Sequence, residues 1–511
     1  MTQPTRDDES RSDQVSVLAF LGRGEHGQPP KRIDTHISIV FLEPDRVLKV
    51  KRAVRLPFLD YSTLDKRKRA CEEELIVNKH YAPQLYRRVV PITRDSGRIE
   101  IDGRGVPIEW AVEMARFDET KTLDRLCASS SLSADLADQL ADVMLASHQQ
   151  AAISDGSAWL PSISDIIDRN TRKFRSQAAL ADNAVEQLHT LSHQRLSSNR
   201  DLLRRRATAG LVRRCHGDAH LGNIVLIDEK PVLFDAIEFD PVMASIDVLY
   251  DLAFPIMDFL HFGQGTPANQ LFNRYLRKTL SSNGEALRLF PLFLSIRAAI
   301  RSHVLFTKCE QATADASIAK EAQSYFELSL RLIMPAKPTF VVIGGRSGTG
   351  KSVLARNLAG LPSPPPGAVV LRSDIIRKEL FGVDDLVTLP PSAYHGDVSE
   401  RVYRIMFERG RDIVAQGFSV VLDAAFLQQS KREAVALAAR KTGAAFRPIF
   451  LTADSAIRQS RVGARRRDAS DATREIAARQ ESTVIGRLDW PTVDASGTPE
   501  QTLERSAAKI R

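Results

Sequence analysis

The sequence predicts two domains of different class, an α+β domain over residues 14–333 and an α/β domain with a parallel sheet over residues 339–511. A chain of 511 residues is too long for one hydrophobic core, so two or three domains are expected. Two prolines in "MPAKP", residues 334–338, interrupt a helical stretch and mark the linker. After this linker, short apolar runs alternate with helical segments, as in a parallel sheet covered by helices.

The composition is that of an ordinary globular protein, with 43% hydrophobic and 26% charged residues. The start is polar and no apolar run reaches 18 residues, so we expect a disordered tail over residues 1–13, no membrane partner and a cytoplasmic location. Four dispersed cysteines without a C-x-x-C pair argue against a disulfide framework and a zinc site. The net charge of +8 does not by itself establish binding to nucleic acid, because phosphate sites also need arginine.

The stretch "GGRSGTGKS", residues 344–352, has the spacing of a P-loop, which holds a nucleoside triphosphate. An apolar run precedes it and a helical segment follows, so backbone N–H groups and a helix N-terminus would surround the phosphates. Lys351 would neutralise the outer phosphates, and the Ser352 hydroxyl would bind the Mg²⁺ ion that bridges them. The predicted nucleotide-binding residues of this loop are Gly345, Ser347, Gly348, Thr349, Gly350, Lys351 and Ser352.

Two further predicted strands of this domain run into an aspartate, "AVVLRSD" at Asp374 and "FSVVLDAAF" at Asp423. In an α/β sheet, ligands bind at the carboxyl ends of the strands. Asp423 fits a carboxylate that holds Mg²⁺ through water, and Asp374 fits a catalytic base for a substrate hydroxyl. Either aspartate could instead be a helix N-cap, which is the common role at a strand-to-helix turn.

Arg461 and Arg465 share one face of a predicted helix just past the last strand of the sheet. Arginines on a mobile segment can close over the negative charge of a phosphoryl group in transfer, so we predict a catalytic lid here. A solvated basic helix end is the alternative.

The segments "GGRSGTGKS", "LRSDIIRKEL", "VVLDAAF" and "RRRDASDA" resemble those of small P-loop kinases. This group includes gluconate kinases, zeta-toxin-like kinases and the kinase part of polynucleotide kinase-phosphatases. The resemblance covers roughly residues 338–511 and implies ATP-dependent phosphorylation of a hydroxyl group, without a single substrate.

A second motif lies in "CHGDAHLGNIVLIDEKPVLFDAIEFD", residues 215–240. It matches the catalytic loop H-G-D-x-H-x-x-N of aminoglycoside phosphotransferase-like kinases. The resemblance implies a protein-kinase-like α+β fold, with a small lobe over about 14–118 and a helical large lobe over about 119–333. It also implies that Asp218 is the catalytic base and that Asn223 and Asp235 hold Mg²⁺.

Cys215, His216 and His220 could instead hold zinc, but no second ligand cluster of suitable spacing accompanies them. A buried His216 that orients the loop is the favoured interpretation. The loop also has Gly217 where protein kinases carry arginine, and "FDAIEF" replaces D-F-G, which favours a small-molecule kinase.

The upstream segment offers the other parts of a kinase-like nucleotide site. Lys49 and Lys51 share one face of the predicted strand "RVLKVKR", Glu74 lies on the next helix, and Glu113 and Met114 enter the hinge. The resemblance implies that Lys49 pairs with Glu74 and contacts the phosphates, although the alternation leaves Lys51 open. No glycine-rich loop precedes this strand, which leaves a degenerate kinase as an alternative.

The order of the domains resembles bacterial two-domain proteins described as bifunctional phosphotransferase and ATP-binding proteins. We therefore expect an enzyme with two ATP- and Mg²⁺-dependent sites that phosphorylate hydroxyl groups of small sugar-like or aminoglycoside-like molecules. A nucleic-acid end kinase is the first alternative, favoured by the basic charge but not by the few aromatic residues of the C-terminal domain. A regulatory ATP-binding protein with one degenerate site is the second.

Overall fold

The computed structural model describes residues 6–24, 28–56, 59–129, 132–311, 316–463, 469–471, 475, 478 and 480–510. It divides into two compact units, each assembled from several stretches of the chain. Unit 1 comprises Met1–Ser131, Val143–Ile163 and Leu203–Pro255. Unit 2 comprises Leu132–Asp142, Ser164–Leu202 and Ile256–Arg511. Four helices contribute residues to both units: α4 (Ala134–Gln150), α5 (Trp159–Arg175), α7 (Arg200–Thr208) and α9 (Val248–His261).

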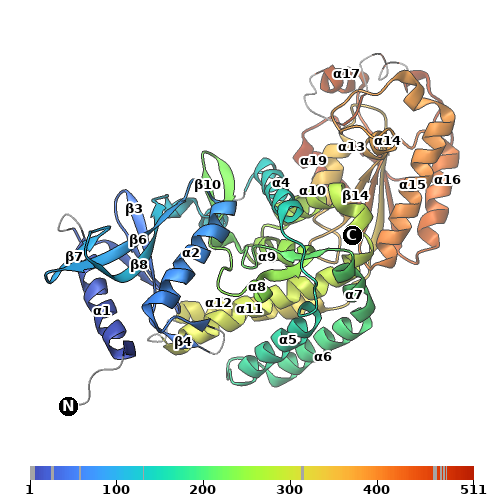
Figure 1. Cartoon of the computed structure of the whole chain (residues 1–511). Helices are drawn as coiled ribbons and strands as arrows, with labels where there is room; N and C mark the ends of the chain where they lie inside the picture. The colour runs from blue at the N-terminus through green and yellow to red at the C-terminus, as the bar shows by residue number, and fades with distance from the viewer. Residues whose placement is uncertain are drawn as a thin grey trace. The chain divides into compact units, whose positions relative to one another are not determined.

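Unit 1 is built on a six-stranded antiparallel sheet with the order β1-β2-β3-β8-β6-β7 (Figure 1). Along β3, alternation sends Leu48 and Val50 to the face covered by α1. Val47 and the two lysines of the strand lie on the opposite face, where α2 packs. The bounds are β1 Lys31–Asp34, β2 Ser38–Leu42, β3 Arg46–Lys51, β6 Tyr86–Asp95, β7 Arg98–Ile101, β8 Val106–Ala115, α1 Arg6–Leu21 and α2 Leu64–Tyr81.

Helix α1 begins at Arg6, so the prediction of a disordered tail over residues 1–13 is wrong from residue 6 onward. Its C-terminal half is anchored on the sheet. Asp13 pairs with Arg94 at 2.6 Å, and the Gln14 amide donates to the carbonyl of Lys51 at 2.9 Å. These long-range contacts stabilise a helix that the polar sequence did not predict.

Two short antiparallel strand pairs in unit 1 frame the two loops that carry the kinase-like motif. Strand β9 pairs with β12, and β10 pairs with β11. The loop after β9 therefore ends at the start of the β10–β11 hairpin, and the loop after β11 begins at its end. The bounds are β9 Val212–Arg214, η2 Leu221–Asn223, β10 Ile224–Ile227, β11 Lys230–Leu233, α8 Pro241–Ala244 and β12 Ser245–Asp247. The remaining elements are β4 Arg55–Leu56, β5 Leu59–Asp60, η1 Glu119–Lys121 and α3 Leu123–Ser129.

The helical part of unit 2 contains α6 (Asp182–Ser198), α10 (Gly265–Asn283), η3 (Glu285–Leu289), α11 (Phe290–Gln311) and α12 (Ala316–Ile333). Hydroxyl groups of α11 donate to backbone carbonyls of α12, with Ser302 on Ala322 at 2.7 Å. The stretch Glu285–Glu310 is long and apolar enough to cross a membrane, but 78% of its apolar window is buried in the fold. It is a core helix.

The second part of unit 2 is a parallel five-stranded sheet with the order β14-β15-β13-β16-β17. Helices α13 and α19 cover one face, where Leu354 and Leu358 pack on Val341 and Ile343. Helix α15 packs on the other face with α16 beside it (Figure 1). The bounds are β13 Thr339–Gly345, α13 Lys351–Leu358, β14 Val369–Arg372, α14 Ser373–Leu380, η4 Pro391–Tyr394, α15 Gly396–Ala415, β15 Val420–Asp423, α16 Gln429–Arg440, β16 Ala445–Thr452, α17 Ser455–Gly463, η5 Gln480–Ser482, β17 Thr492–Asp494 and α19 Pro499–Ile510.

Two asparagines of α10 satisfy backbone groups at the open edge of this sheet. Asn273 accepts from the N–H of Val370 in the edge strand β14 at 2.7 Å. The amide groups of Asn269 and Asn273 both donate to the carbonyl of Ala368, at 3.1 and 3.0 Å. An unpaired edge strand promotes association with other chains, so α10 also protects unit 2 from aggregation.

Candidate active sites

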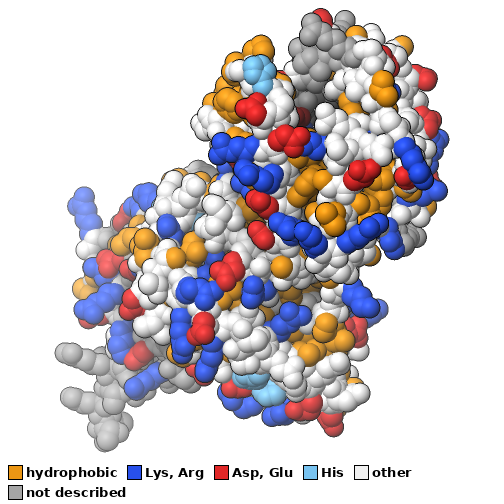
Figure 2. Space-filling model, turned by 90° about the vertical axis from the view of Figure 1, so that its right-hand side faces the viewer, with side chains coloured by type: hydrophobic (Ala, Val, Ile, Leu, Met, Phe, Trp, Pro, Cys, Tyr) orange, Lys and Arg blue, Asp and Glu red, His pale blue; other side chains and the backbone are white. Residues whose placement is uncertain are grey.

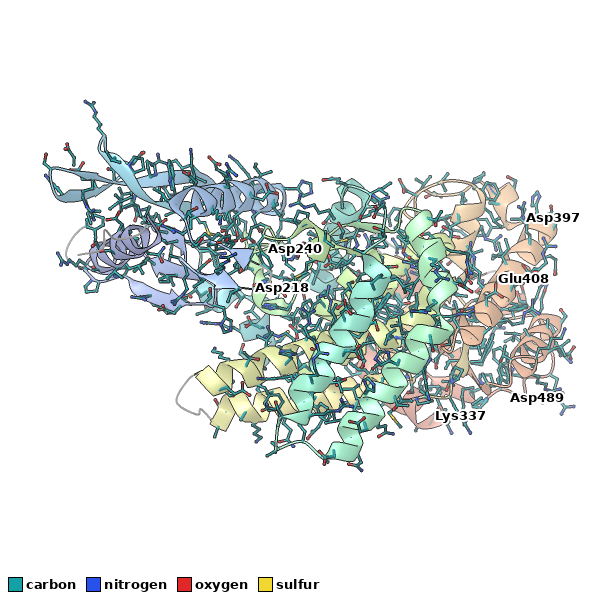
Figure 3. The ribbon with its side chains drawn as sticks, turned by 60° about the horizontal axis from the view of Figure 1, so that its bottom comes forward. Asp218, Asp240, Lys337, Asp397, Glu408 and Asp489 are labelled. Carbon is teal, nitrogen blue, oxygen red and sulfur yellow. The ribbon has the colours of Figure 1, made fainter. Side chains whose placement is uncertain are left out.

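Asp218 lies in the loop between β9 and β10 of unit 1 (Figure 3). The preceding Gly217 has φ +83°, and a Cβ at this position would lie 2.9 Å from Cδ1 of Ile237. Glycine is therefore the residue that this turn requires. The Gly217 N–H donates to Oδ1 of the buried Asp251 at 2.9 Å, and this bond fixes the loop.

The imidazole of His216 is fully buried and bonded at both nitrogens. Nε2 donates to the carbonyl of Phe234 at 3.0 Å, and Nδ1 accepts from the N–H of Asp218 at 3.3 Å. Burial lowers the pKa of His216, in keeping with one donor and one acceptor nitrogen. Among the described residues, Cys215, His216 and His220 do not form a metal-ligand cluster, so the zinc alternative is wrong.

The side chain of Asn223 reaches back to Asp218. Its Nδ2 donates to the carbonyl oxygen of Asp218 at 3.0 Å and to the carboxylate Oδ2 at 3.2 Å. Because Nδ2 is engaged in this way, the amide oxygen is the atom of Asn223 that can bind a metal ion. The predicted base and one predicted metal ligand therefore lie in direct contact.

A buried charge network connects β3, α2 and the loop after β11. Lys49 Nζ lies 2.7 Å from Glu74 Oε1 and 2.5 Å from Asp235 Oδ1. Lys51 Nζ lies 2.6 Å from Glu74 Oε2 and also pairs with Glu238. Both lysines thus bind Glu74, but only Lys49 contacts Asp235. Lys49 therefore lies next to the predicted metal ligand, and Lys51 lies deeper in the fold.

Opposing effects set the pKa values in this network. Partial burial acts to raise the pKa of Asp235, whose side chain is still 43% exposed, but the charge of Lys49 outweighs this effect and holds the pKa below its usual value. The pKa of Glu74 is also lowered, since its two lysines outweigh its burial. Burial raises the pKa of Glu238 despite Lys51. At neutral pH, Asp235 and Glu74 are both charged, and Asp235, whose side chain is partly exposed, is the one that can bind a metal ion.

The predicted hinge residues lie at the end of β8. The Met114 side chain belongs to the core cluster that includes Val47 and Val225. The Glu113 carboxylate lies 3.4 Å from Arg87 and 3.2 Å from Arg88, so it is paired within the small lobe. Both residues lie in a strand that pairs with β3 on one side and with β6 on the other.

The second site is the loop between β13 and α13 in unit 2. Gly345, Gly348 and Gly350 all have positive φ, at +142°, +84° and +86°. A Cβ at Gly345 would lie 2.6 Å from the carbonyl oxygen of Leu451, and one at Gly348 would overlap the carbonyl oxygen of Arg458. The loop therefore needs these glycines to bring its backbone close to a ligand. Lys351 begins α13, and its Nζ donates to the carbonyl of Arg346 at 3.0 Å.

The end of β15 carries the acidic partner of this loop. The Ser352 hydroxyl donates to Asp423 Oδ2 at 2.6 Å, and Arg372 Nε lies 3.3 Å from the same oxygen. Asp423 is 4% exposed and begins no helix, so the N-cap alternative is wrong for this residue. Two hard oxygen donors thus meet beside the first turn of α13, which suits Mg²⁺.

Asp374 lines the same cavity of about 500 Å³ as Lys351, Ser352 and Asp423. It occupies the first turn of α14, but the cap position belongs to Arg372, so the N-cap alternative is wrong here too. Burial raises the pKa of Asp374, with Asp423 adding to the effect and Arg372 opposing it. A carboxyl group with a raised pKa is a better proton acceptor than an ordinary aspartate.

The structure places one of the two predicted lid arginines, Arg461, and does not describe the other. Arg461 lines the cavity, but its guanidinium donates to the carbonyls of Ala495 at 2.7 Å and Gly497 at 2.7 Å. It is therefore tethered to the segment after β17 instead of free to close. Arg465 lies outside the described residues. Arg458, one turn before Arg461, donates to the carbonyl of Ser347 in the P-loop at 3.2 Å.

Several residues at these sites were not identified from the sequence. Asp251 could have been suspected, because it is a carboxylate within the apolar stretch of α9. Glu238 follows Asp235 by three residues but has no motif signal. Residues of the cavity wall that were missed include Arg377, Tyr394, Tyr403, Asp471 and Gln480. Of these, Asp471 belongs to the segment "RRRDASDA", in which the prediction concerned the arginines and not this aspartate.

Comparisons with known proteins agree with this geometry. Residues 49–290 match the model of the phosphotransferase enzyme family, and residues 340–484 match the model of an AAA domain. Uncharacterised proteins of Mycobacterium tuberculosis (strain H37Rv) and Mycobacterium bovis are each 26% identical over 98% of this chain and 98% of their own length.

Solved structures are similar to each part separately. An ADP-bound aminoglycoside phosphotransferase is 13% identical and covers 63% of this chain and 99% of its own, with a TM-score of 0.32. A gluconokinase from Sinorhizobium meliloti is 19% identical and covers 34% of this chain and 91% of its own, with a TM-score of 0.25. The kinase-like loop and the P-loop thus fall within separate matched families. The chain thus combines a region similar to the phosphotransferase enzyme family with a following region similar to an AAA domain, which contains the P-loop.

Proposed function

We propose that the protein is an ATP- and Mg²⁺-dependent kinase with two nucleotide sites, each of which transfers the γ-phosphoryl group to a hydroxyl group of a small sugar-like or aminoglycoside-like molecule. The observation that carries the proposal is the shared cavity of unit 2. There, a phosphate-binding loop, two oxygen donors for a metal ion and an aspartate with a raised pKa face the same space.

In the P-loop site, the chain's residues fit a magnesium-bound triphosphate. The positive φ angles of Gly345 and Gly348 open the loop for phosphate oxygens, and Ser352 and Asp423 offer the oxygen ligands that Mg²⁺ prefers. When bound, the magnesium nucleotide supplies the phosphoryl group and its charge neutralisation. Lys351 would hold the outer phosphates, and Asp374 would accept the proton of the attacking hydroxyl.

In the kinase-like site, Asp218 would accept the proton of a second hydroxyl substrate. Its hydrogen bond from Asn223 fixes the carboxylate, and Asn223 and Asp235 provide oxygens for Mg²⁺. Lys49 would contact the phosphates, since it lies beside Asp235 and is held by Glu74. Because the chain has the predicted base, both predicted metal ligands and the phosphate-contacting lysine, turnover at this site is favoured over a purely regulatory role.

The distribution of charge supports a small substrate over a nucleic acid. Figure 2 shows acidic side chains interspersed with basic ones over the visible face. A nucleic-acid strand requires a continuous basic track with stacking aromatic residues. The cavity of unit 2 has a volume suited to a small molecule, since ligand pockets commonly measure about 300–1,000 Å³.

The test is ADP release by the full chain with a panel of sugars, nucleosides, aminoglycosides and 5′-hydroxyl oligonucleotides. Four proteins are compared: wild type, Lys351→Ala, Asp218→Asn and the double variant. We expect Lys351→Ala to abolish one set of substrate-dependent activities and Asp218→Asn to lower another by about 10²- to 10⁴-fold, the usual contribution of a general base. The double variant should have neither activity.

Two results would contradict the proposal. Turnover only with 5′-hydroxyl oligonucleotides would identify a nucleic-acid end kinase. Magnesium-dependent ATP binding without turnover on any acceptor, and without effect of Asp218→Asn, would support the regulatory alternative for the kinase-like site. Because the double variant lacks both predicted functions, it also measures any contaminating kinase in the preparation.

A further inference from the structure

We propose that Asp168, His189 and His193 form a binding site for a divalent transition metal of the zinc class, which joins helices α5 and α6 of unit 2. These three side chains lie outside both candidate active sites. Within the part of the chain that the structure describes, they are one of two groups in which three potential ligand atoms lie within 4.8 Å of one another.

The backbone of two helices sets the arrangement. His189 and His193 are four residues apart on α6, so their side chains lie on the same face, one turn apart. Their rings are in contact, with centroids 4.5 Å apart. Asp168 reaches them from α5. A His-x₃-His pair that faces a carboxylate on a neighbouring helix supplies two nitrogen ligands and one oxygen ligand, a set that zinc accepts.

The distances suit a tetrahedral ion. His193 Nε2 lies 2.9 Å from Asp168 Oδ1, and His189 Nδ1 lies 4.0 Å from the same oxygen. Zinc–ligand bonds of about 2.0–2.1 Å at tetrahedral angles place two ligand atoms ~3.3 Å apart. The two observed distances lie on either side of this value, so small side-chain rotations suffice. Three protein ligands leave the fourth position for water.

The site is open to the ion. The side chains of His189, His193 and Asp168 are 30%, 32% and 40% exposed. The other cluster, formed by His148, Cys215 and Asp251 in unit 1, is completely buried. Asp251 in that cluster already accepts the N–H of Gly217, which fixes the kinase-like loop. Accessibility therefore favours the α5–α6 cluster.

Two hydrogen bonds compete with the metal. In the first, His193 Nε2 donates to Asp168 Oδ1 at 2.9 Å, and the second involves Thr171. The Thr171 hydroxyl lies 3.2 Å from His189 Nδ1 and donates to the carbonyl of Ile167 at 2.9 Å. Since a hydroxyl has one hydrogen, Thr171 then accepts from a protonated Nδ1. Metal binding through Nδ1 must displace that proton. Thr171→Val, which has nearly the same shape, removes the second of these hydrogen bonds and should strengthen metal binding.

The experiment uses the full chain, stripped with a chelator and kept in excess Mg²⁺ without nucleotide, so that sites with oxygen ligands are occupied. Co²⁺ is titrated with detection by visible absorption, and Zn²⁺ is then added in competition. We expect one equivalent of Co²⁺ with tetrahedral-type absorption, no thiolate-to-cobalt charge-transfer band, and displacement by Zn²⁺. Zn²⁺ should also raise the melting temperature.

The variants identify the ligands. His193→Ala and Asp168→Asn should each weaken Co²⁺ binding by at least about tenfold, as loss of a ligand or its orienting partner does. Thr171→Val should bind at least as tightly as wild type. His36→Ala is the matched control, because His36 is an exposed histidine of unit 1 outside the cluster. Its binding should equal that of wild type.

Four outcomes would overturn the proposal. The first is the lack of saturable Co²⁺ binding by the wild-type protein. The second is equal binding by wild type and His193→Ala when both proteins have the same circular dichroism spectrum. The third is a thiolate charge-transfer band, which would place the ion at a cysteine. A tenfold loss of affinity in Thr171→Val would refute ligation by His189 Nδ1.

Discussion

Replacing Lys49 or Lys51 by methionine should separate function from stability within one strand. The two lysines share a face of β3 and both bind Glu74, so the sequence pattern alone does not distinguish them. Methionine keeps most of the apolar length of lysine and removes the charge. We expect Lys49→Met to remove nucleotide binding at the kinase-like site and Lys51→Met chiefly to lower the stability of unit 1.

The magnitudes follow from burial. The side chains of Lys51 and Glu74 have no exposed surface, and that of Glu238 is 5% exposed. Removing one partner of a buried ion pair typically costs about 3–5 kcal/mol, because the other charge is left without compensation. In Lys51→Met that charge is Glu238, since Glu74 keeps its contact with Lys49. For a unit of this size, 1 kcal/mol corresponds to about 2–4 °C, so the melting temperature of unit 1 should fall by roughly 6–20 °C.

Lys49→Met should cost less stability for two reasons. Glu74 keeps its contact with Lys51, and the side chain of Asp235 is 43% exposed, so water can solvate its carboxylate. Lys49→Met, however, removes the cation that lies 2.5 Å from Asp235 and that would hold the phosphates bridged by a metal ion at that position. Nucleotide affinity should therefore fall while the melting temperature changes little.

The assay combines scanning calorimetry with calorimetric titration of ATP in the presence of Mg²⁺. Lys351→Ala is included in every protein, so that only the kinase-like site binds nucleotide. Lys121→Met is the matched control, because Lys121 is a lysine of unit 1 whose side chain is 47% exposed. The reasoning is refuted if Lys51→Met melts like the control or if Lys49→Met keeps full ATP affinity.

The remaining predictions concern the P-loop site. Asp374→Asn should lower turnover by about 10²- to 10⁴-fold, while its ATP affinity, measured by titration, stays within twofold of wild type. Turnover equal to that of wild type would exclude a catalytic base at this position. Since burial raises the pKa of Asp374 and only the carboxylate accepts a proton, the acidic limb of the kcat/KM profile should lie above the ordinary aspartate pKa of about 3.9, and Asp374→Asn should abolish that limb. Arg461→Ala should lower the melting temperature of unit 2 as well as turnover, because the backbone carbonyls of residues 495–497 lose their hydrogen-bond donor. Leaving such acceptors without a donor costs about 1–3 kcal/mol of stability. An unchanged melting temperature with reduced turnover would instead support the predicted catalytic lid. Gly348→Ala should abolish ATP binding at this site, because its Cβ would overlap the backbone of Arg458. Binding is measured in the Lys49→Met background, in which the kinase-like site should not bind nucleotide, and normal binding there would contradict the geometry.

Local patterns predicted those parts of the sites that depend on neighbours in sequence. Alternation along "RVLKVKR" placed both lysines on one face of β3, as observed. The P-loop spacing predicted a strand, a glycine-containing loop and a following helix, and the structure has β13, glycines with positive φ and a helix that begins at Lys351. Motif spacing also located Ser352, and the end of an apolar run located Asp423, which the sheet brings into hydrogen-bond contact. In each case the sequence pattern lies within a few residues of the structural feature that it predicts.

Arg461 shows why other features could not be predicted in this way. The helical spacing correctly placed it on α17, where it lines the cavity. Its hydrogen-bond partners, however, are carbonyls after β17, more than 30 residues later, and no sequence period connects them. The contact of Arg458 with the P-loop carbonyl of Ser347 spans 111 residues. A pattern gives the direction of a side chain, but tertiary packing decides what it meets.

The same limit applies to the linker at residues 334–338. Its prolines correctly separate α12 from β13, yet Asn269 and Asn273, which precede the linker, bond the edge of the sheet that follows it. The compact unit therefore includes helices from before the linker as well as the sheet after it. A fragment that begins at residue 338 would lose these partners and leave Ala368 and Val370 without them, since buried or edge backbone groups need a hydrogen bond. Loss of activity in such a fragment could therefore result from the exposed strand edge or from a damaged nucleotide site, and the activity assay would not distinguish the two causes. Point variants in the full chain keep the edge covered, so they are the substitutions from which the role of each active-site residue can be inferred.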